Sequence, residues 1–128
     1  MSTDLDAVLE ANRAFYDAFE QRDLDAMSDV WEHSERIVCT HPGWAALRGW
    51  GSVAGSWFAL FTGPSPIQFI LTDVHADVAG EVAWVTLDEN VIGERIGGTV
   101  SAVNVFARGD DERWRLVVHH GSPVASSQ

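Results

Sequence analysis

The chain has 128 residues, of which 46% are hydrophobic, and this predicts a single domain over residues 1–128 with an ordered core over about 4–123. Its formal net charge of −11, from 19 acidic and 8 basic residues, argues against binding to nucleic acids or to anionic membrane surfaces. The single cysteine, Cys39, and the absence of a signal-peptide pattern after Met1 predict a cytoplasmic protein.

The first segment is predicted to be an amphipathic helix. Apolar residues recur at helical spacing from Leu5 to Phe19, with charged residues between them. Thr3 and Asp6 have the spacing of a capping box, which places the start of the helix near residue 4. Asn12 interrupts the apolar stripe, so it either packs against a backbone partner or reaches a cavity.

Two further helices are predicted before residue 62. Asp23 is a suitable N-cap for a short helix that begins at Leu24 and ends near residue 32. Apolar spacings of three and four predict a helix over residues 50–61. The Gly63-Pro64-Ser65-Pro66 stretch cannot continue that helix.

Strands dominate the rest of the chain. They are expected over residues 36–40, 67–78, 82–92, 99–108 and 114–120. Turn residues at 80–81 and 109–111 separate neighbouring strands and favour antiparallel hairpins. The predicted fold class is therefore α+β, with three N-terminal helices packed on one face of a curved, mostly antiparallel sheet.

The stretch from Val38 to Trp44 contains the first candidate site residue. An apolar strand ends on His41, and a Pro42-Gly43 turn follows directly. Because imidazole titrates near neutral pH and can donate or accept a proton, His41 is a candidate base at the floor of a pocket. The alternative is a histidine that only hydrogen-bonds within the core.

Alternation along the strands identifies further candidates. Thr86 and Asp88 share one face of their strand, while Val85, Leu87 and Glu89 share the other. If Thr86, Asp88, Asn104 and His41 all faced the helices, their number would indicate a water-filled pocket.

The last strand carries two adjacent histidines. His119 and His120 must point to opposite faces, and the pattern does not determine which enters the pocket. The histidines lack the spacing of metal ligands, so no metal site is expected. No nucleotide or cofactor fingerprint is present either.

Several stretches resemble the SnoaL-like branch of the nuclear transport factor 2 superfamily, which also contains ketosteroid isomerases and limonene epoxide hydrolases. They are residues 15–19, 22–27, 38–44, 47–50, 56–57, 83–86, 104–106 and 114–123. The resemblance implies a cone-shaped domain whose helices and curved sheet enclose one pocket. It also implies a homodimer formed through the outer face of the sheet.

The resemblance also suggests roles by position. His41 stands where ketosteroid isomerases place an aspartate base, and Asn104 stands where they place a protonated aspartate. Phe15 occupies the place of their catalytic tyrosine, with Tyr16 one residue away. These departures argue against steroid isomerisation, and the Asp-Arg-Asp arrangement of the epoxide hydrolases is not recognisable.

The hypothesis that follows is a cofactor-free acid/base enzyme of isomerase, cyclase or hydratase type. His41 would act as the base and Asn104 as a donor to a developing oxyanion, while Asp88, His119 or His120 would orient the base. The substrate would be an apolar or aromatic carbonyl compound. The expected lining residues are Phe15, Tyr16, Phe19, Trp31, Trp44, Trp57, Phe61 and Thr86.

Two other interpretations remain open at this point. The domain could bind an apolar small molecule, or assemble as a dimer, without turnover. Alternatively, the polar residues could only hydrogen-bond one another in a filled core, as buried networks often do. An open cavity beside the polar residues would favour the small-molecule interpretations.

Overall fold

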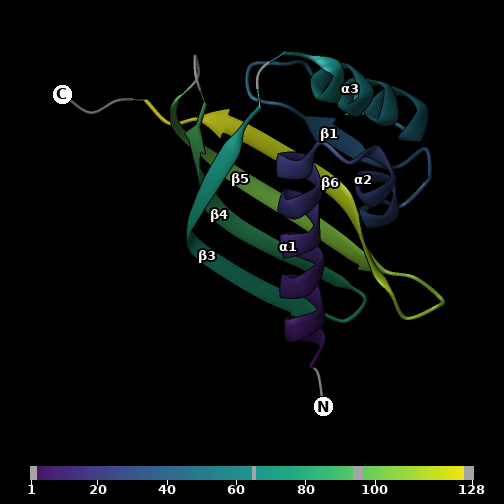
Figure 1. The fold of residues 1–128 in the computed structure, drawn as a ribbon. Helices are drawn as coiled ribbons and strands as arrows, with labels where there is room; N and C mark the ends of the chain where they lie inside the picture. Colours follow the sequence, from purple (N-terminus) through teal and green to yellow (C-terminus); the bar gives the residue numbers. More distant parts are fainter. Residues whose placement is uncertain (1–2, 65, 94–96, 126–128) are drawn as a thin grey trace.

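The computed structural model describes residues 3–64, 66–93 and 97–125, and within them it shows three helices and a six-stranded mixed sheet (Figure 1). The helices are α1 (Asp4–Gln21), α2 (Leu24–Val30) and α3 (Trp50–Thr62). The strands are β1 (Val38–Thr40), β2 (Leu47–Arg48), β3 (Gln68–Ala79), β4 (Val82–Ile92), β5 (Gly97–Arg108) and β6 (Trp114–Pro123). The predicted α+β class is confirmed.

N-terminal caps fix the starts of α1 and α2 where the sequence predicts them. The Thr3 side chain accepts a hydrogen bond from the Asp6 amide, and the Asp6 carboxylate accepts one from the backbone N–H of Thr3. The Asp23 carboxylate caps α2 by accepting from the Ala26 amide. Each cap satisfies amides that would otherwise lack a partner in the first turn.

The sheet has the strand order β2-β1-β6-β5-β4-β3. Its pairs are antiparallel except for β1 and β6, which run parallel. The five predicted strands are present with shifts of one to three residues at several ends. The sixth, β2, pairs with Val38 and Cys39, and its two residues are too few to show alternation in the sequence.

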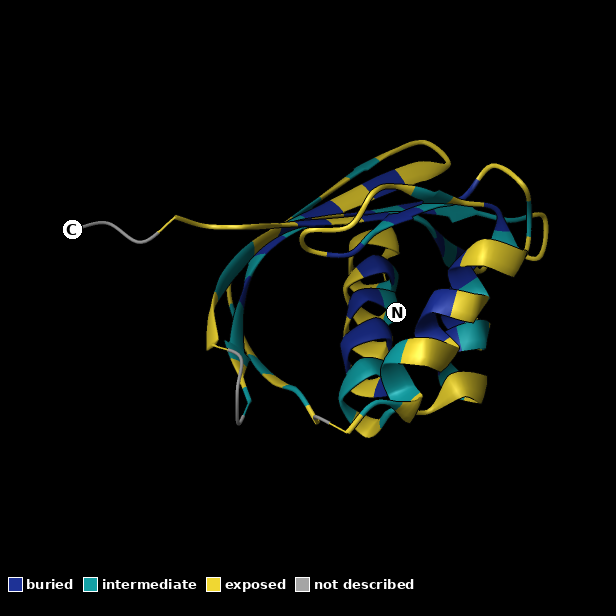
Figure 2. Cartoon of the chain, turned by 90° about the horizontal axis from the view of Figure 1, so that it is seen from above, coloured by how far each residue is buried: buried dark blue, intermediate teal, exposed yellow. Residues whose placement is uncertain are grey.

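All three helices lie on one face of the sheet, called here the inner face (Figure 2). The sheet curves around them, and α1 crosses its inner face, where it packs against β3, β4 and β6 (Figure 1). The core between the two layers contains the large buried side chains Phe15, Trp31, Trp57, Phe106 and Leu116. No helix in the described ranges is both long enough and apolar enough to cross a bilayer.

A bulge in β6 decides which histidine faces inward. Val105 pairs with Val118 whereas Phe106 pairs with Leu116, so Val117 is an extra residue on this strand. Strict alternation from Leu116 would turn His119 outward. Because the bulge shifts the register by one residue, His119 is instead buried on the inner face with 1% of its surface exposed.

Candidate functional site

Five buried polar side chains meet where α1 crosses the sheet. Asn12 and Tyr16 lie one turn apart on the same side of α1, because side chains four positions apart are neighbours on a helix. The sheet supplies Glu89 from β4, Asn104 from β5 and His119 from β6. We call these residues the polar network.

Asn104 is the centre of the polar network. Its amide nitrogen donates to Oδ1 of Asn12 at 2.8 Å and to the phenolic oxygen of Tyr16 at 3.2 Å. Its amide oxygen lies 2.6 Å from Nδ1 of His119, which is its cross-strand neighbour in the β5–β6 register. The Asn104 side chain therefore connects the helix layer to the sheet and is fully buried.

Tyr16 links the network to a buried carboxylate. Its hydroxyl donates to Oε2 of Glu89 at 2.5 Å. Burial raises the pKa of Glu89 to about 7, although the hydrogen bond from Tyr16 partly opposes this shift. Burial and the nearby Glu89 charge also raise the pKa of Tyr16, so the phenol stays protonated at neutral pH. Glu89 can therefore gain or lose a proton near pH 7.

His119 supports the network as a neutral ring. An amide oxygen only accepts, so His119 donates from Nδ1 to Asn104. Burial lowers the pKa of His119 to about 3, with smaller effects from His41 and His120. The ring therefore fixes the orientation of the Asn104 amide and carries no charge at neutral pH.

The polar network reaches a cavity of about 610 Å³ between α1 and β3. Asn12 and Tyr16 lie in its wall, and the other lining residues are Leu9, Arg13, Asp17, Glu20, Phe69, Leu71 and Val74. Leu71 is the cross-strand neighbour of Glu89. A small molecule in this cavity would therefore lie against two residues of the polar network, of which Tyr16 is bonded to Glu89.

His41 is buried outside the polar network. Its Nε2 lies 2.9 Å from the Ser56 hydroxyl, which donates its own proton to the carbonyl oxygen of Val53. His41 therefore donates to Ser56 from Nε2. Burial lowers the pKa of His41 to about 4, so this ring is also neutral at pH 7. Its ring packs against Trp57, with the two centroids 4.8 Å apart.

The structure does not bring the remaining polar candidates together with Asn104. Thr86 and Asp88 lie on the outer face of β4, because the buried residues Val85, Leu87 and Glu89 occupy the inner positions of that strand. His120 is exposed on the outer side of β6.

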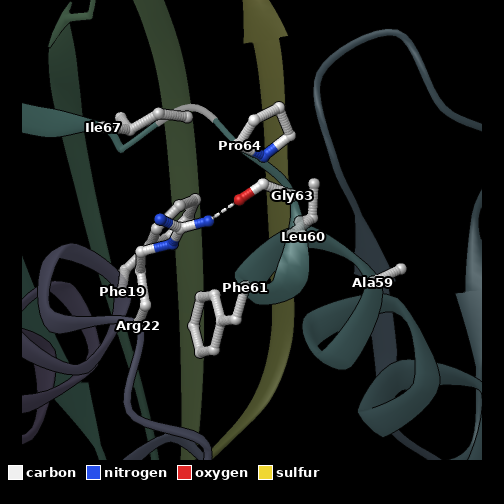
Figure 3. A pocket seen from close by; sticks show the side chains of 8 residues that line it. All are labelled: Phe19, Arg22, Ala59, Leu60, Phe61, Gly63, Pro64 and Ile67. Atoms are coloured by element: carbon white, nitrogen blue, oxygen red, sulfur yellow. Dashed lines mark hydrogen bonds between the residues drawn. The ribbon is translucent and has the colours of Figure 1, made fainter.

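The aromatic candidates also lie in different parts of the protein. Phe15, Trp31 and Trp57 are buried in the core, where the Phe15 ring contacts both indoles edge to face. Phe19 and Phe61 line a second, smaller cavity near the C-terminal end of α3 (Figure 3).

Trp44 lies neither in the core nor at either of these cavities. It is 44% exposed and lies against His41, with the two ring centroids 4.8 Å apart. The eight expected lining residues therefore do not surround one shared cavity.

Sequence reasoning missed the role of Glu89 in this site. Its signal is present, because Glu89 shares a strand face with Val85 and Leu87, which are residues of a buried surface. A carboxylate in that series must be paired or neutralised. Asn12 is a signal of the same kind, because it is a polar residue on the apolar stripe of α1.

Within residues 3–64, 66–93 and 97–125, no three His, Cys, Asp or Glu side chains gather as metal ligands would.

The comparisons with known proteins agree on the fold. Residues 8–126 match the family model of the SnoaL-like domain. The structure of a proposed dehydratase of the NTF2-like family from Streptomyces avermitilis is 38% identical, with a TM-score of 0.88 over 96% of this chain and 97% of that chain. A proposed calcium/calmodulin-dependent protein kinase type II association domain from Thiobacillus denitrificans is 34% identical, with a TM-score of 0.81 over 90% and 93%.

More distant relatives extend the similarity. A proposed ketosteroid isomerase from Parabacteroides distasonis has a TM-score of 0.78 over 96% of this chain and 89% of that chain, but its 14% identity shows a shared fold alone. The F-box protein SKIP8 of Arabidopsis thaliana is 28% identical over 116 residues. This match covers 91% of the chain and 49% of that protein, so the chain spans about half the length of its curated relative.

Proposed function

Because the chain belongs to the SnoaL-like domain family, we propose that it is a cofactor-independent acid/base enzyme acting on an apolar or aromatic carbonyl compound. The observation that carries this proposal is the hydrogen-bonded pair of Tyr16 and Glu89 at the wall of the 610 Å³ cavity. A buried carboxyl group whose pKa is raised to about 7 is matched to proton transfer at neutral pH.

The pair would work as a short proton relay. Tyr16 would contact a substrate oxygen or an acidic C–H group, and Glu89 would take or return the proton through the phenolic hydroxyl. Asn104 already donates to the phenolic oxygen, which would stabilise negative charge there as the proton moves. Removal of a proton next to a carbonyl, followed by its return to another carbon, gives an isomerisation. Where the substrate carries a β-hydroxyl group, the same enolate can instead re-form the carbonyl and expel that group, which leaves as water with the proton that Glu89 holds; the result is a dehydration.

The other sequence candidates take supporting roles in this proposal. His119 would hold the Asn104 amide in the orientation that points its nitrogen at Tyr16. His41, neutral and bonded to Ser56, would support the core beneath Trp57. The similarity to a proposed dehydratase at 38% identity supports a reaction of the hydratase class without identifying its substrate.

A second candidate function is assembly. The outer face of the sheet carries apolar side chains with large exposed fractions, including Val82 (44%), Trp84 (37%) and Val103 (37%). Such a surface favours a protein partner. We propose that it joins two copies of the chain into a homodimer, and the similarity to a proposed association domain supports this. Dimerisation and catalysis in the inner cavity are compatible, because they use opposite faces.

The enzyme proposal is tested by screening a library of aromatic carbonyl compounds for turnover and comparing matched variants. With any substrate that is converted, Tyr16→Phe and Glu89→Gln should each lower kcat by about 10²- to 10⁴-fold. Glu89→Gln should also remove the dependence of kcat on pH near 7. Both variants keep the size of the side chain, so packing changes little.

The matched control is Asp110→Asn, which neutralises an exposed carboxylate on the β5–β6 turn. Its kcat and pH profile should equal those of the wild type. If both inner variants retain kcat within about tenfold of the wild type, the relay is wrong. Binding of library compounds without conversion of any of them would instead support the binding-module alternative.

A further inference from the structure

A second cavity, of about 200 Å³, lies between the C-terminal ends of α1 and α3 (Figure 3). Its walls are largely apolar and include the side chains of Phe19, Leu60, Phe61, Pro64 and Ile67. Among its described lining residues, the one charged group is the guanidinium of Arg22. The cavity thus combines a largely apolar wall with one positive charge.

The guanidinium of Arg22 is positioned at the cavity by a backbone contact. Its Nη2 donates to the carbonyl oxygen of Gly63, just after the end of α3 (Figure 3). A guanidinium has five N–H donors, so this bond leaves others available to a ligand. Within residues 3–64, 66–93 and 97–125, Arg22 forms no ion pair with a carboxylate, whereas Arg36, Arg108 and Arg115 do. Its charge is therefore open to an anion in the cavity.

The backbone of Arg22 adds a second observation. The residue ends α1 in the left-handed conformation, with φ 56° and ψ 42°. Glycine is the residue that takes this position at a helix end without strain. The arginine at this position therefore carries a small backbone strain, and its side chain lies at the cavity.

From these observations we propose that this cavity binds a small carboxylate with an apolar body. The carboxylate would pair with the planar guanidinium of Arg22, whose donor geometry matches two oxygens at once. The apolar body would pack against Phe19 and Phe61. The apolar walls would shield one side of such a pair from water, which strengthens it.

This site is separate from the one proposed for catalysis. The 610 Å³ cavity has Phe69 in its wall, and the Phe69 ring packs edge to face on Phe19 with centroids 4.8 Å apart. The two aromatic rings thus form a partition between the cavities. The inference does not depend on the acid/base chemistry, and either proposal can fail alone.

Isothermal titration calorimetry with phenylacetate and with 2-phenylethanol tests the proposal. The two probes share an aromatic body and differ in the charged group. The wild-type protein should bind phenylacetate at least about tenfold more tightly than the alcohol, because charge-assisted hydrogen bonds are the stronger kind. Arg22→Gln should weaken phenylacetate binding at least about tenfold and leave the alcohol affinity unchanged.

Arg113→Gln is the matched control, since it removes one positive charge from an exposed position on the β5–β6 turn. It should bind both probes as the wild type does. Equal affinity of the wild type for the acid and the alcohol would overturn the proposal, and so would unaltered phenylacetate binding by Arg22→Gln. The comparison of the two probes needs no variant, so equal affinities would overturn the proposal even if Arg22→Gln fails to fold.

Discussion

The phenolic oxygen of Tyr16 lies 2.5 Å from Oε2 of Glu89, a residue 73 positions further along the chain. This bond connects the first helix to the inner face of β4 and places a carboxyl group in a largely apolar layer. Burial shifts the pKa of Glu89 to about 7, so its protonation couples the stability of the fold to pH near neutrality.

Glu89→Gln should change how stability depends on pH. The pKa of Glu89 is raised on folding, from 4.5 to about 7, so its stabilising contribution is complete below pH 4.5 and is lost as the pH rises through 7. Gln does not ionise. The free energy of unfolding of the variant, relative to the wild type, should therefore increase by on the order of 3 kcal/mol between pH 4.5 and 7. Urea unfolding across this range measures it.

The control for this experiment is Glu10→Gln, which removes the same charge from the exposed surface of α1. The free energy of unfolding of this variant should change with pH as that of the wild type does over the same range. If the free energies of unfolding of Glu89→Gln and the wild type also show the same pH dependence, Glu89 is not the group that titrates near pH 7.

Asn12 and Asn104 should behave as a coupled pair. Replacing either residue by leucine leaves the other with a buried polar atom that has lost its partner, at a cost of about 1–3 kcal/mol in the free energy of unfolding. The double variant loses both partners together. Its cost should be smaller than the sum of the single costs by at least about 0.5 kcal/mol, measured by urea unfolding. Strictly additive costs would show that the bond between the two amides contributes nothing.

The fold followed from the sequence more closely than the site did. Caps at Thr3 and Asp23 and long alternating strands are local signals, and the structure confirms what they predict. The partners of Asn104 depend instead on which strand face meets the helices, and alternation leaves that choice open.

The case of His119 shows the same limit more sharply. The extra residue Val117 reverses the alternation within a single strand, and it breaks no obvious pattern in the sequence. Long-range register of this kind depends on the pairing of β5 with β6. It cannot be obtained from either strand alone.

Acid should destabilise the protein partly through His119. The pKa of this ring falls from 6.5 to about 3 on folding, so its contribution is complete above pH 6.5 and is lost as the pH falls toward 3. Between pH 6.5 and 5 the loss amounts to about 2 kcal/mol. His119→Gln stays neutral in both states and should lose correspondingly less stability over this interval in urea unfolding. An equally steep loss in the variant would show that folding does not lower the pKa of His119.

Val103→Glu should dissociate the proposed homodimer. Val103 lies on the outer face of β5 and is 37% exposed, close to the apolar surface formed by Val82 and Trp84 on β4. A carboxylate at this position would have to lose its water in the interface beside its cross-strand neighbours Thr86 and His120, which costs several kcal/mol. Sedimentation velocity at about 10 µM should therefore find the wild type as a dimer and the variant as a monomer.

Phe58→Glu supplies the matched control, because it introduces the same charge at a 58% exposed apolar residue on α3, away from the outer face. This variant should remain a dimer. Since the inner cavity lies on the opposite side of the sheet, monomeric Val103→Glu should keep its fold and its Tyr16–Glu89 pair, so any enzymatic activity would survive dissociation. A monomeric wild type at this concentration would remove the homodimer from the proposal, and the exposed apolar surface would then require a different partner.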